Sequence, residues 1–458
     1  MIRLFNVYYP TRTLVLLICE ALLVGASFIV ATASFLGLDN GYIKLMYENG
    51  LVKIAAITFL TLLFSYYFDL YEPQRISARW EAYFRLLLVL SALSFVLAGL
   101  IFFFPQIDIG HNVLAGGVFL LTVLLLVWRR IDEWIVGLPL FCQRVYVLGN
   151  GIRAKQVAEV VRARRDAGMQ IIRSQVENDQ GEPGTDLAAE LRKFCTTKVA
   201  LDRVIVAMEE RRGCMPIREL LDLRLRGVVV EDACNLFERL LGRLPLEGLT
   251  PSALIFTDGF RIRDSRQLMR RLVSFVVAFA ALVICLPVVP LLALAVRLSS
   301  PGPVFFSQTR VGLQGRPFTL YKFRTMRRDA EPNGAAWAVK NDPRITSVGA
   351  FMRKTRLDEI PQLWNVLRGD MGFVGPRPER PEFVQWLSHE IPYYDLRHMI
   401  RPGLTGWAQV RYHYGSSLDE TRRKLEYDLY YLKHLSLGLD LLILFETVKT
   451  IVLGRGAQ

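Results

Sequence analysis

The residues best suited to chemistry are two adjacent carboxylates, Asp358 and Glu359, in the segment Arg-Lys-Thr-Arg-Leu-Asp-Glu-Ile-Pro-Gln at 353–362. An isolated Asp-Glu pair before a helix is more often a helix cap and a solvated first-turn acid. Here a helical pattern begins near Leu363, and Pro361 is tolerated in its first turn. We therefore expect the helix field to favour an ionised Asp358. A chemical role for the pair depends on its surroundings.

Fixed cations surround this pair along the sequence. Lys322 and Arg324 share one side of a predicted strand, and Arg353 shortly precedes the carboxylates. Two stiff Gly/Pro loops carry Arg377 and Arg401. Carboxylates among fixed cations suit Mg²⁺-assisted phosphoryl transfer, in which cations bind phosphate oxygens and a carboxylate holds the metal. We expect both carboxylates to be catalytic and to hold Mg²⁺, and all five cations to bind substrate phosphates. The five histidines show no metal-ligand spacing, which argues against a zinc hydrolase.

The elements that position these residues begin with four apolar runs in the first third of the chain, at 13–38, 54–68, 86–107 and 109–128. These runs predict transmembrane helices. Basic residues before the first, between the second and third, and after the fourth place the N-terminus in the cytoplasm and return the chain there. Glu20 interrupts the first run. Because the sequence shows no partner for it, a functional intramembrane carboxylate and a packed structural one stay equally open.

A fifth apolar run, 272–296, has basic residues on both sides. Two basic flanks oppose a simple crossing, and Pro287 and Pro290 interrupt the helical pattern. We therefore expect a helix–break–helix hairpin over about 270–298 that enters the membrane and returns, with a kinked spanning helix as the alternative. The last apolar stretch, 435–453, suits a helix lying at the bilayer surface.

Between these membrane segments, residues 141–258 have the pattern of an α/β domain. The predicted strands cover residues 144–148, 171–176, 203–208 and 228–230. Their alternation with helical patterns predicts a parallel sheet with crossover helices. Gly149 and Gly151 stand where a dinucleotide fingerprint would, between a strand and a helix. Glu177 is a weak candidate for the ribose-binding acid, so we expect a fold kept for packing or regulation more than a working cofactor site.

The overall composition agrees with a membrane protein that handles phosphates. Of the 458 residues, 52% are hydrophobic, yet 56 Lys and Arg against 43 Asp and Glu give a net charge of +13. With membrane segments present, this surplus indicates lipid head groups and phosphates as partners, and no nucleic acid. The six cysteines show no CxxC spacing, which favours unpaired thiols over a disulfide frame or a metal site.

Four motifs extend the argument beyond single residues. They are Lys-Phe-Arg-Thr-Met at 322–326, Leu-Asp-Glu-Ile-Pro-Gln at 357–362, Gly-Asp-Met-Gly-Phe-Val-Gly-Pro-Arg-Pro at 369–378 and Arg-Pro-Gly-Leu-Thr-Gly-Trp at 401–407. Together they resemble the bacterial sugar transferase family, the monotopic phosphoglycosyl transferases, over about residues 265–454. With the apolar helices and the Rossmann-like domain ahead of it, the arrangement is similar to the large polyprenyl-phosphate hexose-1-phosphate transferases of exopolysaccharide assembly.

This resemblance implies a re-entrant membrane hairpin and a covalent ping-pong mechanism. Asp358 is then the nucleophile that attacks the sugar-bearing phosphate of a UDP-sugar and expels UMP. Glu359 helps to hold Mg²⁺, while Lys322, Arg353 and Arg377 match basic positions around the phosphates. Polyprenyl phosphate, such as undecaprenyl phosphate, finally takes the sugar phosphate from the aspartate.

We therefore expect three domains: a four-helix transmembrane domain at 1–140, a Rossmann-like domain at 141–258, and an α/β catalytic domain at 259–458 that carries the hairpin. The catalytic domain is expected on the cytoplasmic face of a bacterial inner membrane. Expected partners are the UDP-sugar, polyprenyl phosphate, membrane lipid, a second copy of the chain in a homodimer, and downstream glycosyltransferases. The resemblance favours glucose or galactose as the sugar, and the residues do not choose between them.

Two other readings stay open. A membrane-anchored nucleotide-sugar dehydratase or epimerase also joins helices to a Rossmann domain, but it needs a Tyr-x-x-x-Lys pair. None of the 17 tyrosines has a lysine four positions further on. A non-catalytic membrane scaffold that senses nucleotides through the middle domain would not need an Asp-Glu pair among several cations.

Overall fold

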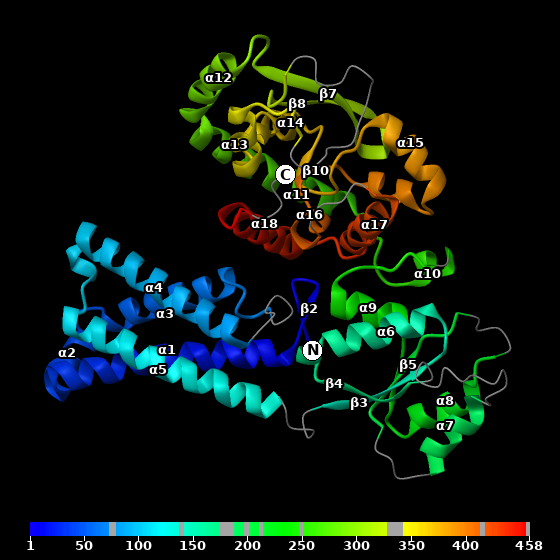
Figure 1. The fold of residues 1–458 in the computed structure, drawn as a ribbon, viewed down its shortest axis with the longest axis horizontal. Helices are drawn as coiled ribbons and strands as arrows, with labels where there is room; N and C mark the ends of the chain where they lie inside the picture. Colours follow the sequence, from blue (N-terminus) through cyan, green and yellow to red (C-terminus); the bar gives the residue numbers. More distant parts are fainter. Residues whose placement is uncertain are drawn as a thin grey trace. The chain divides into compact units, whose positions relative to one another are not determined.

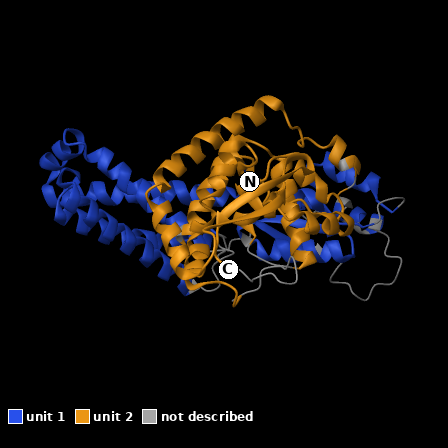
Figure 2. Cartoon of the chain, turned by 90° about the horizontal axis from the view of Figure 1, so that it is seen from above, with its two compact units in different colours: residues 1–2, 8–236 blue, residues 3–7, 237–458 orange. Residues whose placement is uncertain are grey.

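In the computed structural model the chain forms two compact units, one of residues 1–2 and 8–236 and the other of residues 3–7 and 237–458 (Figure 2). The structure describes residues 1–72, 79–136, 142–174, 187–196, 201–209, 214–247, 249, 251–327, 342–412 and 417–454. Glu177 lies outside them. Residues 237–258 belong to the same compact unit as the predicted catalytic domain, and the three-domain division stays a prediction.

Long apolar helices fill the first part of the first unit (Figure 1). They are α1 (Thr11–Leu36), α3 (Gly50–Tyr67), α4 (Arg79–Phe103) and α5 (His111–Val136), with the short α2 (Leu38–Met46) after α1. Each long helix has the length and composition to cross a membrane. Phe28 and Leu93 belong to their shared core, whereas Phe95 and Phe119 stay exposed, as lipid contact permits. The four predicted apolar helices are confirmed, and α2 was not predicted.

Glu20 is buried within these helices and has two close partners. Arg129 Nη2 lies 2.6 Å from its Oε1, and the Tyr71 hydroxyl donates to its Oε2 at 2.5 Å. Arg129 Nη1 also donates to the Leu70 carbonyl oxygen at 3.0 Å. A buried carboxylate is tolerated when it is paired and hydrogen-bonded in this way. The structure therefore supports the packed structural role for Glu20.

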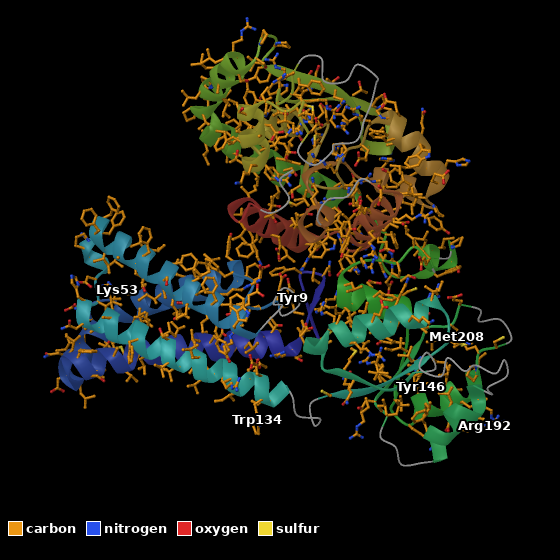
Figure 3. All side chains as sticks on the ribbon, viewed as in Figure 1. Tyr9, Lys53, Trp134, Tyr146, Arg192 and Met208 are labelled. Atoms are coloured by element: carbon orange, nitrogen blue, oxygen red, sulfur yellow. The ribbon has the colours of Figure 1, made fainter. Side chains whose placement is uncertain are left out.

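The remainder of the first unit holds a parallel sheet with the strand order β4-β3-β5-β6. Its strands are β3 (Gln143–Leu148), β4 (Met169–Ser174), β5 (Arg203–Val206) and β6 (Val229–Asp232). The connecting helices are α6 (Ile152–Ala163), α7 (Leu187–Thr196) and α8 (Ile217–Leu225). Tyr146 and Met208 lie in the sheet's apolar core (Figure 3). Crossover helices bury such strands, which explains their continuous apolar runs, and the predicted parallel α/β sheet is confirmed.

The second unit is built from short strands and many helices (Figure 1). Its strand pairs are the antiparallel β7 (Phe305–Val311) with β8 (Pro317–Phe323) and the parallel β9 (Gly372–Val374) with β10 (Gly403–Thr405). Its helices are α10 (Pro251–Phe256), α11 (Asp264–Cys285), α12 (Val288–Ser299), α13 (Ser347–Thr355), α14 (Gln362–Arg368), α15 (Pro381–Glu390), α16 (Trp407–Arg411), α17 (Leu418–Lys433) and α18 (Leu437–Val452). Helix α9 (Ala233–Leu241) starts just before the division between the units.

The fifth apolar run is interrupted at Pro287, between α11 and α12. Pro290 lies in the first turn of α12, where a missing N–H costs little. Ala278 from α11 and both Leu292 and Val296 from α12 belong to one buried cluster of the second unit. Both helices therefore pack against the same core. Of the apolar window of α11 only 6% is buried, and exposed side chains such as Val276, Phe279 and Val283 are available to contact lipid.

Helix α18 turns its polar side chains inward. Asp440, Glu446 and Lys449 are only 7%, 4% and 2% exposed, whereas Leu441 and Val448 are 63% and 50% exposed. A helix at a water surface shows the opposite arrangement. An outward apolar face supports the prediction that α18 lies on a membrane.

The second unit also includes the start of the chain, which the sequence did not predict. Near the short strands β1 (Ile2–Leu4) and β2 (Val7–Tyr9), Asn6 Nδ2 donates to the His434 carbonyl oxygen at 3.1 Å and to Ser436 Oγ at 3.0 Å. The Tyr430 hydroxyl donates to the Asn6 carbonyl oxygen at 2.8 Å. These contacts fasten residues 3–7 to the junction between α17 and α18.

Candidate active site

Asp358 and Glu359 lie in a short 3₁₀ turn, Leu357–Glu359, between α13 and α14. The turn is possible because Arg356 ends α13 in the left-handed region, with φ +55°. A non-glycine residue in that region is strained, and such strain often accompanies functional sites. The reversal ends α13 and separates the two carboxylates from both helices.

Glu359 is held between two arginines. Arg377 Nη2 lies 3.1 Å from its Oε1, and Arg356 Nη1 lies 3.5 Å from its Oε2. Burial would raise the pKa of Glu359, but Arg377 and Arg356 outweigh that effect and lower the pKa below its usual value. Glu359 is therefore an ionised side chain in a defined orientation.

Asp358 is 8% exposed, and no group in the described part of the chain donates a hydrogen bond to its carboxylate. Burial and the neighbouring charge of Glu359 raise its pKa to about 6, although Lys322 and Arg353 act in the other direction. The pKa is therefore shifted in the direction opposite to the one expected from the helix field, although a carboxyl group with a pKa of about 6 stays mostly ionised at pH 7. The reason is position: α14 begins at Gln362, after Pro361, so its first turn does not reach Asp358.

The structure brings three of the five predicted cations to Asp358: Lys322, Arg353 and Arg377. Lys322, on β8, lies over the Phe306 ring with Nζ 5.2 Å from the ring centre. Burial and the nearby Arg353 lower the pKa of Lys322 to about 8, against the opposing effect of Asp358. Arg353 Nε donates to Thr325 Oγ1 at 3.0 Å, which helps to fix its guanidinium.

The other two predicted cations, Arg324 and Arg401, donate hydrogen bonds to backbone carbonyl oxygens instead. Arg324 donates to the Ser300 carbonyl oxygen at 2.6 Å and to that of Pro301 at 3.0 Å, so it ties the end of α12 to β8. Arg401 Nε donates to the Gly369 carbonyl oxygen at 3.1 Å, at the end of α14. Burial lowers the pKa of Arg401, and neighbouring arginines contribute to the shift.

Arg356 and Arg397 also belong to the site and were not predicted as site residues. Arg356 was visible as the residue three positions before Glu359. Arg397 Nη2 donates to the Arg377 carbonyl oxygen at 3.0 Å, and its guanidinium pairs with Asp428 at 2.9 Å. It therefore orients the backbone of the loop that carries Arg377. No local pattern indicates this role, because Arg377, Arg397 and Asp428 meet only in the folded chain.

The donor set fits a magnesium ion. Mg²⁺ usually takes one or two protein carboxylates and completes its shell with water and substrate phosphate oxygens. Asp358 and Glu359 provide two adjacent carboxylates, with Lys322, Arg353 and Arg377 close to Asp358. Among the residues that the structure describes, no group of three or more His, Cys, Asp or Glu side chains could enclose an ion. The arrangement therefore suits an ion that arrives with a phosphate-bearing substrate.

The glycine motif in the first unit is less suited to a ligand. Gly149 has φ +131°, as a tight turn requires. A Cβ on Gly151 would lie only 2.4 Å from Glu209 Oε1. An acidic side chain thus crowds the glycine turn at the start of α6, where a pyrophosphate would approach. This supports the expectation of a fold kept for packing or regulation.

Comparison with known proteins shows that this chain is similar to transferases of sugar phosphates. Residues 265–454 match the family described as bacterial sugar transferase. The chain is 33% identical over 311 residues to a UDP-glucose:undecaprenyl-phosphate glucose-1-phosphate transferase of Escherichia coli, covering 66% of each protein. It is 40% identical over 231 residues to a transferase of the same name from Caulobacter vibrioides, covering 48% of this chain and 86% of that protein.

A third relative has a different sugar in its name. The chain is 47% identical over 190 residues to the UDP-N-acetylgalactosamine-undecaprenyl-phosphate N-acetylgalactosaminephosphotransferase of Aeromonas hydrophila, covering 42% of this chain and 45% of that protein. The chain therefore spans between about half and two thirds of the length of the Aeromonas and Escherichia proteins.

Proposed function

We propose that this chain, which belongs to the bacterial sugar transferase family, transfers a hexose-1-phosphate from a UDP-sugar to polyprenyl phosphate. One observation carries the proposal: a buried carboxylate, Asp358, lies among Lys322, Arg353 and Arg377. The names of the relatives contain undecaprenyl phosphate as the lipid, with UDP-glucose or UDP-N-acetylgalactosamine as the donor. The product would be the first lipid-linked sugar of an exopolysaccharide.

The first half-reaction forms a covalent intermediate. A carboxylate oxygen of Asp358 attacks the phosphorus that carries the sugar, and the bond from that phosphorus to the bridging oxygen of UMP breaks. The electron pair leaves with UMP. Lys322, Arg353 and Arg377 hold the phosphate oxygens in place and offset their negative charge. Bound Mg²⁺ would be held by Glu359 and Asp358 and would add positive charge at these oxygens.

The second half-reaction passes the sugar phosphate to the lipid. A phosphate oxygen of polyprenyl phosphate attacks the phosphorus of the aspartyl intermediate, and the bond to Asp358 breaks. The products are polyprenyl diphosphate sugar and the free carboxylate. Dividing the transfer in this way lets one site receive a soluble donor and then a lipid acceptor.

The membrane arrangement is part of the proposal. The two basic flanks of the 272–296 run support a re-entrant hairpin of α11 and α12, as does their packing against one core. The outward apolar face of α18 supports a position of the catalytic residues close to lipid. We assign them to the cytoplasmic face of the inner membrane, within the predicted domain at 259–458, and expect the chain to work as a homodimer that supplies downstream glycosyltransferases.

The test is a single-turnover experiment on the purified chain. Wild-type protein given the UDP-sugar without acceptor is expected to release at most one UMP per site and to gain the mass of a hexose phosphate. Asp358→Asn should show neither, because the amide keeps the shape but is a poor nucleophile. Asp419→Asn, at a strongly exposed aspartate on α17, is the control and should behave as wild type. UMP that appears only with polyprenyl phosphate, and no trapped adduct, would indicate direct in-line transfer and overturn the role of Asp358.

A further inference from the structure

A mostly apolar cavity of about 190 Å³ lies beside Glu359, the neighbour of Asp358 in the chain, within the second unit. Arg356 and Glu359 are part of its lining, together with residues of α11, α14, α16 and α18. Pockets for whole drug-sized ligands usually measure roughly 300–1,000 Å³. This cavity therefore suits a short piece of a larger ligand, and its apolar wall does not suit a nucleotide or a sugar.

Two of the cavity's walls come from helices that present apolar side chains outward. Ala281 belongs to α11, of whose apolar window only 6% is buried. Thr450 and Ile451 belong to α18, whose Leu441 and Val448 are exposed. An apolar chain embedded in lipid could follow these helices into the cavity without crossing water. That continuity favours a lipid ligand over a soluble one.

Gln409, on α16, adds a polar group to this apolar wall. Its amide oxygen and nitrogen are both buried, and neither has a hydrogen-bond partner among the residues that the structure describes. Buried amides in folded proteins almost always have partners, so this one is suited to bind a ligand. The amide NH₂ group can donate to a phosphate oxygen.

We propose that this cavity binds the phosphate end of the polyprenyl phosphate acceptor. The first isoprene unit fills the apolar space between α11 and α18, and Gln409 donates to the phosphate that it carries. Glu359 and Arg356, which line the cavity, flank the turn that carries Asp358, so a phosphate bound there would lie near the intermediate. This inference rests on the proposed function and adds the location of its acceptor site.

The test uses two adjacent positions on one helix. Ala281→Phe places a ring in the cavity, whereas Ala280→Phe places the same ring on the exposed side of α11. Both variants are compared with wild type in two assays: adduct formation from the UDP-sugar alone, and decay of the isolated adduct on addition of undecaprenyl phosphate.

We expect Ala280→Phe to match wild type in both assays. Ala281→Phe should form the adduct but pass it to undecaprenyl phosphate at least about tenfold more slowly. The new ring keeps part of the isoprene unit out of the cavity, and losing the burial of only two methylene-sized groups already corresponds to about this factor. Normal transfer by Ala281→Phe would overturn the acceptor site. Loss of adduct formation in Ala281→Phe alone would assign the cavity to the donor. Failure of wild type to form any adduct would instead refute the proposed function.

A binding measurement tests the acceptor site independently of the transfer reaction. A geranylgeranyl phosphate with a diazirine on its first isoprene unit should crosslink to residues of the cavity, and undecaprenyl phosphate should compete. Gln409→Leu should weaken this labelling while leaving the adduct assay unchanged. Equal competition by phosphatidylglycerol would mean that the cavity takes any lipid chain. That result, or labelling confined to other parts of the chain, would overturn the proposal.

Discussion

Replacing Arg397 with methionine tests how the loop that carries Arg377 is held. Arg397 is buried and makes three contacts: with Asp428 at 2.9 Å, the Tyr394 hydroxyl at 2.7 Å and the Arg377 carbonyl oxygen at 3.0 Å. Methionine keeps much of the side chain's length and removes all three. The variant therefore perturbs the support of the site without altering a group that touches substrate.

The size of the expected loss of stability follows from the burial of Asp428, which is only 2% exposed. Removing one partner of a buried ion pair leaves an uncompensated charge and costs about 3–5 kcal/mol of unfolding free energy. For a unit of this size, each kcal/mol lowers the melting temperature by roughly 2–4 °C, so we expect a decrease of about 6–20 °C. A slight displacement of the Arg377 loop should also slow adduct formation, on the order of 10–100-fold.

The stability deficit of Arg397→Met should also depend on pH, which gives a second way to test this prediction. Burial raises the pKa of Asp428 to about 6 even with Arg397 present, and removing Arg397 raises the pKa further. A carboxyl group whose pKa is raised in the folded state stabilises the fold at low pH and loses that contribution as the pH rises through the folded pKa. The deficit of Arg397→Met should therefore be smaller at pH 5.5 than at pH 8.

The assay is melting of the intact chain followed by tryptophan fluorescence, with adduct formation measured well below the melting temperature. Arg316→Met, at an exposed arginine between β7 and β8, controls for loss of an arginine. Asp428→Asn in the Arg397→Met background should recover most of the lost stability, because no buried charge remains. Melting within about 2 °C of wild type, together with normal adduct formation, would refute the reasoning, since a broken buried pair costs more than that.

Two further predictions concern the membrane hairpin and the first unit. Arg263→Cys and Arg316→Cys, each in a chain without native cysteines, should react with an impermeant thiol reagent only after the inner membrane is opened; reaction of position 316 in cells with only the outer membrane permeable would rule out the re-entrant hairpin. Gly151→Ala should keep transfer within about threefold of wild type, because the three atoms nearest to its new methyl group all belong to the flexible side chain of Glu209. Complete loss of activity in that variant, with folding unchanged, would show that the glycine turn takes part in the reaction.

The sequence alone determined the features that depend on neighbouring residues. The four apolar helices could be predicted because the transfer of an apolar run into lipid depends on its length and composition. The parallel sheet followed from strands such as Val145–Leu148, which are apolar throughout because helices cover both faces. The motif with the Asp-Glu pair at 357–362 and the loops at 369–378 and 401–407 could be recognised because these motifs are long and follow one another in a specific order. The break at Pro287 followed from the missing N–H of proline.

Only the tertiary structure decided which charges meet. It paired Glu20 with Arg129, brought Lys322 to Asp358, and used Arg324, two positions further along, to hold the end of α12. It also reversed the expected direction of the pKa of Asp358, because desolvation and the charge of Glu359 exceed the effect of nearby cations. Burial and Coulomb energies depend on distances through space between residues far apart in the chain, and those distances exist only once the chain has folded.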